Sequence, residues 1–424
     1  MLSHLLLVGK IFVILIGQTW TKLRLRLRSI VHRFTYQAGS QPKNIVIVGA
    51  SFAGYHAARC LANSLPSGYR VVVIEKNSHF QLTWVLPRFC VVDGHDNKAF
   101  IPYGSYVKGP PGSCHWVRDI VTSVIPAENK GSDRCREGSR GGNVKLASGD
   151  SIPYEYLVLA TGSAAGLPSR VCETDKEAGM KALSDQRQKI AKAQDIVVVG
   201  GGPAGIELAA DAKAQFPEKR VTLIHSRATL LNDGFGTKMH LAICEEMDRL
   251  GVNLVLGQKP SIPDGMTGSI KLSGGDVIHY DCLIKCVGQK PNSSLLSFLS
   301  PETFTRSGYI RVQPSLQVLD DAFPEIYAAG DVIEAGAIKN ARSAVQQAQT
   351  VAVNICRHIH GQRQIEYMQQ WWEGTTKLTL GVGKSVVYIT DYCVEVLFSS
   401  GRQKIELDSA MVWKYFGAKP YVDH

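Results

Sequence analysis

The chain has 424 residues, enough for two or three domains, and 45% of its residues are hydrophobic and 20% charged, as in an ordinary globular enzyme. Its formal net charge is +10, but residues 1–43 hold seven Lys and Arg and no acid, so the remainder carries 10 − 7 = +3. A nearly neutral body without a basic stripe excludes nucleic-acid binding as the main function. Ten cysteines without a paired spacing favour free thiols in a reducing compartment over a secreted disulfide framework.

The first 43 residues form a basic and apolar segment that we expect to be a membrane anchor or a targeting segment. Residues 5–17 hold ten Leu, Val, Ile or Phe around Lys10. Inserting these side chains into a bilayer gains about 5 kcal/mol and burying the lysine costs about 3 kcal/mol, so a short anchor and an interfacial helix both stay open. Membrane association through residues 1–33, on a cytoplasmic face or in mitochondria, is the first expectation, and a mitochondrial presequence is the second. Leu2 is not the glycine that N-myristoylation requires.

The first glycine-rich turn has the sequence GASFAG at residues 49–54. It follows a run typical of a buried strand, NIVIVG at residues 44–49, and it leads into a helix. Gly49 and Gly54 would let the backbone approach a pyrophosphate, whose charge meets the helix N-terminus. Ser51 offers a hydroxyl group in place of the middle glycine. The next strand ends at Glu75, which is placed to bind a ribose diol, the alternative being a glutamate that caps the surface.

Two further strand ends belong to the same predicted domain. The strand YLVLA at residues 156–160 leads into a second turn with Thr161 and Gly162, and the strand at residues 326–331 ends in Asp331. The acid could hold a ribitol hydroxyl of FAD. A helix that starts near Asn340 would point its positive end at the flavin and stabilise the anion of the reduced flavin.

A second glycine-rich turn lies about 150 residues after the first. The strand DIVVVG runs into GGPAGIELAA, with the same strand, turn and helix order, and the glycines of the turn are Gly200, Gly202 and Gly205. The next strand ends in His225, Ser226 and Arg227, without the acid that binds the ribose diol in NAD-specific enzymes. Ser226 and Arg227 could meet the 2′-phosphate of NADPH, although Arg227 could equally be a solvated surface charge. We therefore expect both NADH and NADPH to serve.

Beside the two glycine turns, the chain carries three shorter motifs, Ala160-Thr161-Gly162, Gly288-Gln289-Lys290-Pro291-Asn292 and Gly330-Asp331. With them, residues 44–360 resemble the two-dinucleotide-binding flavoproteins, the pyridine nucleotide-disulfide oxidoreductase superfamily. No CxxC or CxxxxC pair follows the first turn, where a disulfide reductase holds its dithiol, and Cys60 stands alone in that helix. Without the dithiol, the chain is most similar to the apoptosis-inducing-factor-like branch, which contains the ferroptosis-suppressor quinone reductases.

The resemblance implies roles for four more residues. Glu207 matches the glutamate that the family places beside the nicotinamide, the alternative being a helix-surface acid. Lys339 matches a lysine at the corresponding place in the ferroptosis-suppressor branch and could interact with the flavin or the quinone pocket, the alternative being an exposed loop lysine. Gly288 belongs to a cofactor-binding motif. Gln346 matches the second glutamine of a quinone-lining pattern in type II NADH dehydrogenases, but Arg342 replaces the first, so an ordinary polar residue is an equal alternative.

The C-terminal segment is the least informative part of the sequence. The runs at residues 377–380 and 385–389 predict two strands of a small sheet, followed by a third run at residues 392–398. Family members place a C-terminal domain over the flavin, where it helps to form the acceptor site or touches the membrane.

These observations predict an α/β fold with two Rossmann-like dinucleotide-binding domains and a small C-terminal α+β domain. The expected domains are a discontinuous FAD domain at 44–165 and 287–365, an inserted NAD(P) domain at 166–286 and the C-terminal domain at 366–424. The expected reaction is electron transfer from NAD(P)H through FAD to a quinone-like acceptor, and no metal site is expected. A flavoenzyme of specialised metabolism acting on a small organic substrate and a redox-sensing or death-signalling flavoprotein are the alternatives.

Overall fold

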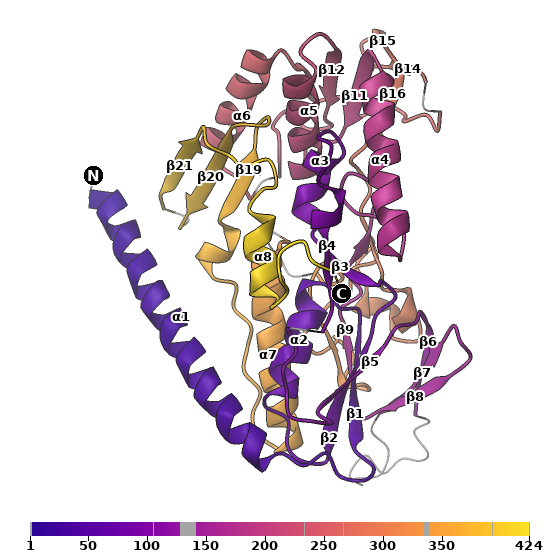
Figure 1. Ribbon diagram of the computed structural model, residues 1–424, viewed down its shortest axis with the longest axis vertical. Coiled ribbons are helices and arrows are strands. Elements are labelled where there is room, and N and C mark those ends of the chain that lie inside the picture. The colour runs from indigo at the N-terminus through magenta and orange to yellow at the C-terminus, as the bar shows by residue number, and fades with distance from the viewer. Residues whose placement is uncertain are drawn as a thin grey trace. The chain divides into compact units, whose positions relative to one another are not determined.

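The computed structural model describes residues 2–104, 106–127, 141–232, 234–265, 267–334, 339–391 and 393–423. The chain forms two compact units, each assembled from three separate stretches (Figure 1). Unit 1 comprises Met1–Ser78, Gly104–Ser163 and Lys290–Glu373. Unit 2 comprises His79–Tyr103, Ala164–Gln289 and Gly374–His424.

Unit 1 is built on a five-stranded parallel sheet with the strand order β18-β9-β1-β2-β5. Residues 45–48 of the central strand β1 are a continuous run of Ile and Val whose side chains are buried on both faces, as a parallel strand covered on both sides requires. Helices α2 and α7 pack against each other in this unit. Strands β6, β7 and β8 form a separate antiparallel sheet.

The elements of unit 1 are α1 (Leu2–Thr35), β1 (Lys43–Val48), α2 (Phe52–Ala62), β2 (Tyr69–Ile74), β5 (Cys114–Val117), β6 (Val121–Pro126), β7 (Gly142–Leu146), β8 (Ser151–Tyr154), β9 (Tyr156–Leu159), β17 (Lys290–Pro291), β18 (Ile326–Ala328) and α7 (Ala341–Ile359), with short 3-10 turns at Ser294–Leu296 and Pro301–Thr303. Strand β10 (Ser163–Ala164) and the 3-10 turn Trp371–Gly374 fall where the chain passes between the units.

The elements of unit 2 are β3 (His79–Gln81), α3 (Leu86–Phe89), β4 (Phe100–Pro102), α4 (Lys176–Lys192), β11 (Asp195–Val199), α5 (Pro203–Gln215), β12 (Arg220–Ile224), α6 (Thr237–Leu250), β13 (Asn253–Val255), β14 (Gly268–Lys271), β15 (Val277–Tyr280), β16 (Cys282–Lys285), β19 (Thr376–Thr379), β20 (Ser385–Thr390), β21 (Glu395–Ser400) and α8 (Ser409–Tyr415), with 3-10 turns at Thr83–Val85 and Asp96–Ala99. Its main sheet is parallel, with the order β13-β12-β11-β16.

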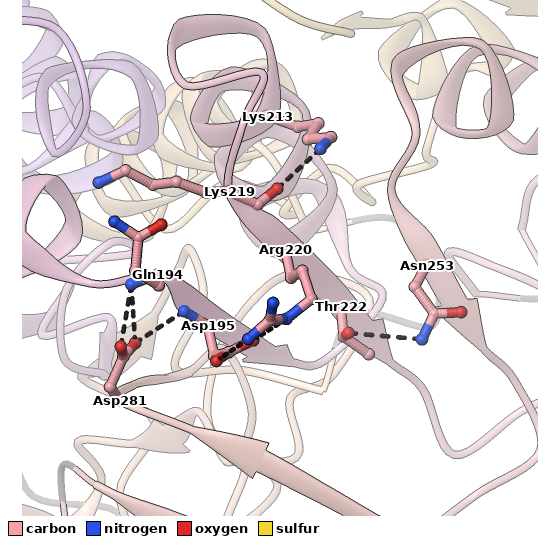
Figure 2. Close-up of polar contacts among 8 residues, drawn as sticks. All are labelled: Gln194, Asp195, Lys213, Lys219, Arg220, Thr222, Asn253 and Asp281. Atoms are coloured by element: carbon pink, nitrogen blue, oxygen red, sulfur yellow. Dashed lines mark hydrogen bonds and ion pairs between the residues drawn. The ribbon is translucent and has the colours of Figure 1, made fainter.

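The amino-terminal edge of this sheet is fastened by side chains (Figure 2). Asp281, just before β16, accepts hydrogen bonds from the backbone N–H groups of Gln194 and Asp195 at 2.9 and 2.8 Å. Asp195 in turn forms an ion pair with Arg220 at the start of β12. Nζ of Lys219 donates to the carbonyl oxygen of Ile190 at 2.9 Å, near the end of α4, where a cation is favoured by the helix dipole. These contacts fix the register of the strands, and the glycine turn lies at the opposite, carboxyl edge.

The fold class predicted from the sequence is confirmed, because the structure is a mixed α/β fold with two parallel sheets. The first two C-terminal strands are confirmed as β19 and β20, and β21 pairs with β20 in the same antiparallel sheet. The third predicted run overlaps β21, but this strand begins at Glu395, and Tyr392, where the run was predicted to start, lies outside the described residues. The basic N-terminal segment forms a single helix of 34 residues, α1. Among the described helices, none combines the length and the hydropathy that a membrane crossing requires.

Candidate functional site

The first glycine turn joins β1 to α2 at the carboxyl edge of the unit 1 sheet. Gly49 has a φ of 93°, a conformation that glycine adopts readily, and a Cβ atom there would lie 2.6 Å from the carbonyl oxygen of Ala160. A Cβ atom at Gly54 would lie 1.8 Å from the carbonyl oxygen of Gly49. Ser51 occupies the N-cap position of α2 without a side-chain capping bond. The turn therefore brings bare backbone to the positive end of a helix, which is the arrangement that favours an anion.

Glu75 lies beside this turn, directly after β2, and is buried. One carboxylate oxygen accepts a hydrogen bond from the N–H group of Ala50, and the other accepts from the N–H group of Asn77 at 2.9 Å. Burial raises the pKa of Glu75, and these hydrogen bonds oppose the rise. The carboxylate thus fastens the glycine turn to the end of the neighbouring strand, a role beyond the predicted contact with a ribose.

A third strand end is joined to the 288–292 motif. The hydroxyl group of Thr161 donates to the carbonyl oxygen of Asn292 at 2.6 Å, and Nδ2 of Asn292 donates to the carbonyl oxygen of Thr161 at 2.9 Å. The N–H group of Asn292 donates to the carbonyl oxygen of Gly162 at 2.9 Å. The sequence motif contained Asn292, but its role in holding the Thr161-Gly162 turn was missed. Gly288 is exposed with a φ of 77°, near the end of a stretch of unit 2.

The strand end at Gly330-Asp331 gathers several groups of unit 1. The N–H group of Gly330 donates to Oε1 of Gln347, a buried residue of α7, at 2.8 Å. Nζ of Lys339 donates to the carbonyl oxygen of Asp331 at 3.1 Å and lies 3.1 Å from the ring centroid of Tyr309. The structure therefore brings Lys339 to Asp331. Gln347, which the sequence interpretation passed over, holds Gly330, while the predicted Gln346 next to it is half-buried.

The ammonium group of Lys339 has an unusual environment. Its side chain is largely exposed, but the ammonium group is partly desolvated over the aromatic ring of Tyr309. This desolvation lowers the pKa of Lys339 to about 8, although the negative charges of Asp331 and Glu334 oppose the change. Lys339 therefore gains and loses its charge close to neutral pH.

Helix α7 starts as predicted. Asn340 is its N-cap, and its side-chain oxygen accepts from the N–H groups of Arg342 and Ser343 at 2.9 and 3.0 Å. Nδ2 of Asn340 donates to the carbonyl oxygen of Glu373 at 2.7 Å, and this second hydrogen bond orients the capping side chain.

The second glycine turn, in unit 2, repeats the construction of the first. Gly200 has a φ of 122°, and a Cβ atom there would lie 2.4 Å from the carbonyl oxygen of Cys286. A Cβ atom at Gly205 would lie 2.0 Å from the carbonyl oxygen of Gly200. Gly202 is the N-cap of α5, and a Cβ atom there would have nothing within 4 Å among the described residues. The space in front of this helix end is open.

His225 connects the end of β12 to this turn. Its Nδ1 atom accepts a hydrogen bond from the N–H group of Gly201 at 3.1 Å, which makes Nε2 the protonated nitrogen of the neutral ring. Nε2 is buried and has no partner among the described residues. Ser226 and Arg227 are exposed beyond it, and Nη1 of Arg227 donates to the carbonyl oxygen of Leu231 at 3.0 Å. The sequence interpretation named Ser226 and Arg227 but assigned no contact to His225.

Glu207 does not lie on an open helix surface. Its Oε1 atom accepts from the N–H and hydroxyl groups of Thr379 in β19, at 3.0 and 3.2 Å. One turn further along α5, Asp211 forms an ion pair with Arg88 at 2.6 Å, and both side chains are 0% exposed. Arg88 also donates to the carbonyl oxygens of Gly381 and Val382. Nothing in the sequence spacing connects Arg88 or Thr379 to Glu207.

Burial and the neighbouring acid change the titration of this cluster. Burial, with a smaller contribution from Asp211, raises the pKa of Glu207 to about 8. Burial also raises the pKa of Asp211 to about 6, against the opposing effect of Arg88. Burial therefore favours the protonated, neutral form of Glu207 at neutral pH.

The cysteines that the structure describes are all free thiols. Burial raises the pKa of Cys60, which lies in α2, to about 12, and burial does the same for Cys114 and Cys286. A thiol with such a pKa stays protonated at neutral pH and is a poor nucleophile. Among the described residues, no group of His, Cys, Asp and Glu side chains is arranged to hold a metal ion.

Two glycine turns of this construction are typical of proteins with two dinucleotide-binding sites, among them the flavoprotein oxidoreductases. The sequence pattern of the pyridine nucleotide-disulphide oxidoreductase family matches residues 43–348, and the chain belongs to this family. Members of the family bind FAD and NAD(P)H, and these are the cofactors of this chain.

Individual proteins of known sequence and structure are similar to this chain. The chain is 33% identical over 390 residues to Fe-regulated protein 8 of Mycosarcoma maydis, covering 88% of this chain and 95% of that protein. It is 28% identical to ferroptosis suppressor protein 1 of Homo sapiens, covering 89% and 96%. The sulfide:quinone oxidoreductase of Aquifex aeolicus has a similar fold, with a TM-score of 0.68 at 15% identity over 88% of this chain and 90% of that one. The predicted resemblance to the apoptosis-inducing-factor-like branch is confirmed.

Proposed function

We propose that this chain is an FAD-dependent NAD(P)H oxidoreductase that passes electrons to a quinone-like acceptor without a redox dithiol, in association with a membrane. The observation that carries the proposal is the combination of two complete glycine turns with thiols that stay protonated. A disulfide-reducing member of the family needs a reactive thiol pair, whereas an acceptor that takes electrons directly from the flavin needs none.

The residues of unit 1 fit FAD. Gly49 and Gly54 keep the turn tight at the start of α2, since a Cβ atom at either position would clash with backbone, and Glu75 lies beside the turn for the adenosine ribose. Two buried polar atoms near the strand ends, Oδ1 of Asn77 and Oγ of Ser163, have no partner among the described residues and are free to accept a ligand hydrogen bond. Thr161, Gly162 and Asp331 complete the proposed set.

The residues of unit 2 fit NAD(P)H in the same way. The open space at Gly202 would take the diphosphate, and Ser226 and Arg227 would meet the adenosine ribose or its 2′-phosphate. His225 would donate from Nε2 at the same place, since Nδ1 is already engaged with Gly201. Gly200 and Gly205 keep the backbone close, whereas Gly288 is assigned to this site only from its motif. We propose unit 2 as the site of the predicted NAD(P) domain.

When bound, FAD supplies hydride acceptance from NAD(P)H and electron release to an acceptor. The protein binds the two nucleotides and places charge near the flavin. We assign Lys339 to the second task, because its ammonium group is held at the strand end that carries Asp331. Glu207 is assigned to the nicotinamide side as a neutral acid, and Gln346 to the acceptor side.

The experiment that tests this proposal uses the full chain with its flavin. The flavin is reduced anaerobically with NADPH, and its reoxidation is timed with a short-chain ubiquinone and, separately, with air. Reoxidation by the quinone at least about tenfold faster than by air is expected, a difference of about 1.4 kcal/mol in barrier.

Other outcomes point elsewhere. Reduction without faster reoxidation would contradict the quinone acceptor and direct attention to a small organic substrate. If quinone turnover were negligible while NADPH changed the oligomeric state, a signalling role would replace the proposal.

A further inference from the structure

The N-terminal helix α1 has one unusually regular face. Its exposed apolar side chains include a set at alternating steps of three and four residues: Val13, Ile16, Trp20, Leu23, Leu27, Ile30 and Phe34. Residues at this spacing share one side of an α-helix. Each of the seven is at least 49% exposed, and we call this set the apolar stripe.

Unit 1 holds α1 by the opposite face. Oγ of Ser29 donates to Oδ1 of Asn63, Nε2 of His32 lies 2.7 Å from the carbonyl oxygen of Leu65, and the hydroxyl group of Tyr36, just past the helix, donates to the carbonyl oxygen of Tyr69. These contacts are made by polar groups. Phe34, two residues beyond His32 and nearly opposite it on the helix, is 87% exposed.

This arrangement is the reverse of ordinary helix packing, in which the apolar face is buried against the body of the protein. Here unit 1 contacts polar groups at the carboxyl-terminal end of α1, and the apolar side chains of the stripe, about three heptads long, are exposed. Since an exposed apolar surface of this length is costly in water, the stripe indicates an interaction surface.

The charged residues around the apolar stripe indicate which kind of partner binds it. Every charged residue in 1–43 is Lys or Arg, seven in all. Lys10 lies to one side of the stripe on the helix and Arg26 and Arg33 to the other, and all three are exposed. A second copy of the chain could pack its stripe against this one as a coiled coil, but it would bring like charges together along the seam. An anionic lipid surface, in contrast, takes apolar side chains into the acyl boundary and meets the basic side chains at its headgroups.

We infer that α1 binds in the plane of an anionic membrane through the apolar stripe, with unit 1 attached to its water-facing side. This inference deepens, and rests on, the membrane association proposed above. It names the lipid chemistry and the helix face. Trp20 and Phe34 are the aromatic side chains expected at the headgroup level.

The test uses the full chain with its flavin and two kinds of vesicle, one of phosphatidylcholine and one of phosphatidylcholine and phosphatidylserine in equal parts. Flotation should show binding to the mixed vesicles at least about tenfold tighter at low salt, because each basic residue near the surface adds attraction. The preference should fall as salt is raised.

Two matched double variants test the face. Ile16→Ser with Ile30→Ser removes two isoleucines from the stripe, and Ile11→Ser with Ile14→Ser removes two from the rest of the helix. The stripe variant should bind the mixed vesicles about tenfold or more weakly, since two buried apolar side chains are lost, and the control variant should bind like the parent.

Equal weakening by both variants would overturn the inference, because total apolarity rather than one face would then decide binding, as in a spanning helix. Equal binding to both vesicle types would overturn the anionic preference. A dimer in lipid-free solution that only the stripe variant loses, without vesicle binding, would replace the lipid by a second copy. Reduction of a short-chain ubiquinone, measured without vesicles for the same samples, reports separately on the proposed enzyme activity.

Discussion

The carboxyl group of Glu207 is buried beside a second acid, and its raised pKa makes the stability of the chain depend on pH. The folded chain binds this proton more tightly than the unfolded chain, in which the ordinary pKa of 4.5 applies. The stabilising contribution is therefore complete below about pH 4.5 and is lost as the pH rises toward 8.

Glu207→Gln should remove this dependence while keeping an acceptor for Thr379. We expect the free energy of unfolding of the variant to gain about 2–3 kcal/mol over the parent between pH 6 and pH 9, measured by urea unfolding. Glu245→Gln, on an exposed residue of α6, is the control and should change nothing. A constant difference between Glu207→Gln and the parent across this range would contradict the buried neutral acid.

Lys339 carries a second pH-dependent charge. Because its pKa is about 8, raising the pH above 8 should remove the positive charge and slow the reoxidation of reduced flavin by ubiquinone. Lys339→Ala should slow the same step about tenfold or more at pH 7, and Lys339→Arg should keep the rate at pH 9. Unchanged reoxidation in Lys339→Ala would return this residue to an exposed loop lysine without a role.

Gly54 tests the first dinucleotide turn directly. A Cβ atom there would lie 1.8 Å from the carbonyl oxygen of Gly49, so Gly54→Ala must open the turn. We expect the purified variant to lose most of its flavin, read from the ratio of flavin to protein absorbance. Gly166→Ala is the control, since a Cβ atom at that exposed position meets nothing within 4 Å among the described residues. Full flavin content in Gly54→Ala would argue against this turn as the FAD site.

At the scale of elements, Arg88 joins three parts of unit 2 that are distant in sequence. Its guanidinium group, carried by α3, donates hydrogen bonds to Asp211 in α5 and to two carbonyl oxygens in the turn between β19 and β20. Arg88→Met should lower the free energy of unfolding by about 3–5 kcal/mol, because Asp211 would be left buried without a partner.

The double variant Arg88→Met with Asp211→Leu separates charge from packing. It should recover much of the lost stability in urea unfolding, since no unpaired charge remains. If the double variant were as unstable as Arg88→Met alone, the hydrogen bonds to Gly381 and Val382 would be the larger contribution.

The elements that sequence predicted best are those with local signals. The β1 and β11 strands are short apolar runs that end in glycine, and α7 starts where Asn340 supplies a cap. The attachment of β19 to α5 had no local signal, because Thr379 and Glu207 are 172 residues apart. The apolar stripe of α1 is visible in the sequence as a repeat, but only the structure shows that the opposite face is the one held.

At the scale of the whole molecule, the protonated state of the buried thiols predicts that the enzyme activity does not depend on a reactive cysteine. Treatment of the enzyme with N-ethylmaleimide should leave NADPH-dependent quinone reduction within about twofold of the untreated rate, because the reactive species is the thiolate and burial suppresses it. The exposed Cys172 and Cys393 should be modified, as mass spectrometry will show. Inactivation that follows modification of Cys60 would instead reveal a catalytic thiol.

The backbone turns of the candidate site could be predicted from the sequence, but most of its side-chain contacts could not. Both glycine turns and Glu75 follow from strand–turn–helix patterns that are local in sequence. Three side chains hold backbone groups that are distant in sequence, which no local pattern reveals: His225, Gln347 and Asn292. The sequence therefore predicted roles for their neighbours, such as Ser226 and Gln346, and not for these three. The domain boundaries at 165, 287 and 366 and the assignments of Lys339, Glu207 and Gln346 stay predictions.

The two strand ends proposed to meet the adenosine riboses differ in how many contacts their side chains make within the protein. Glu75 accepts one hydrogen bond from Ala50 in the glycine turn and one from Asn77 after its own strand, so we expect a substitution there to alter the backbone together with the proposed ribose contact. Ser226 and Arg227 stand outside such a network, with only the Arg227 side chain bonded to a nearby carbonyl. If the proposed sites are correct, we therefore expect substitutions at Ser226 and Arg227 to shift the preference between NADH and NADPH without disturbing the fold, and substitutions at Glu75 to disturb the first glycine turn as well.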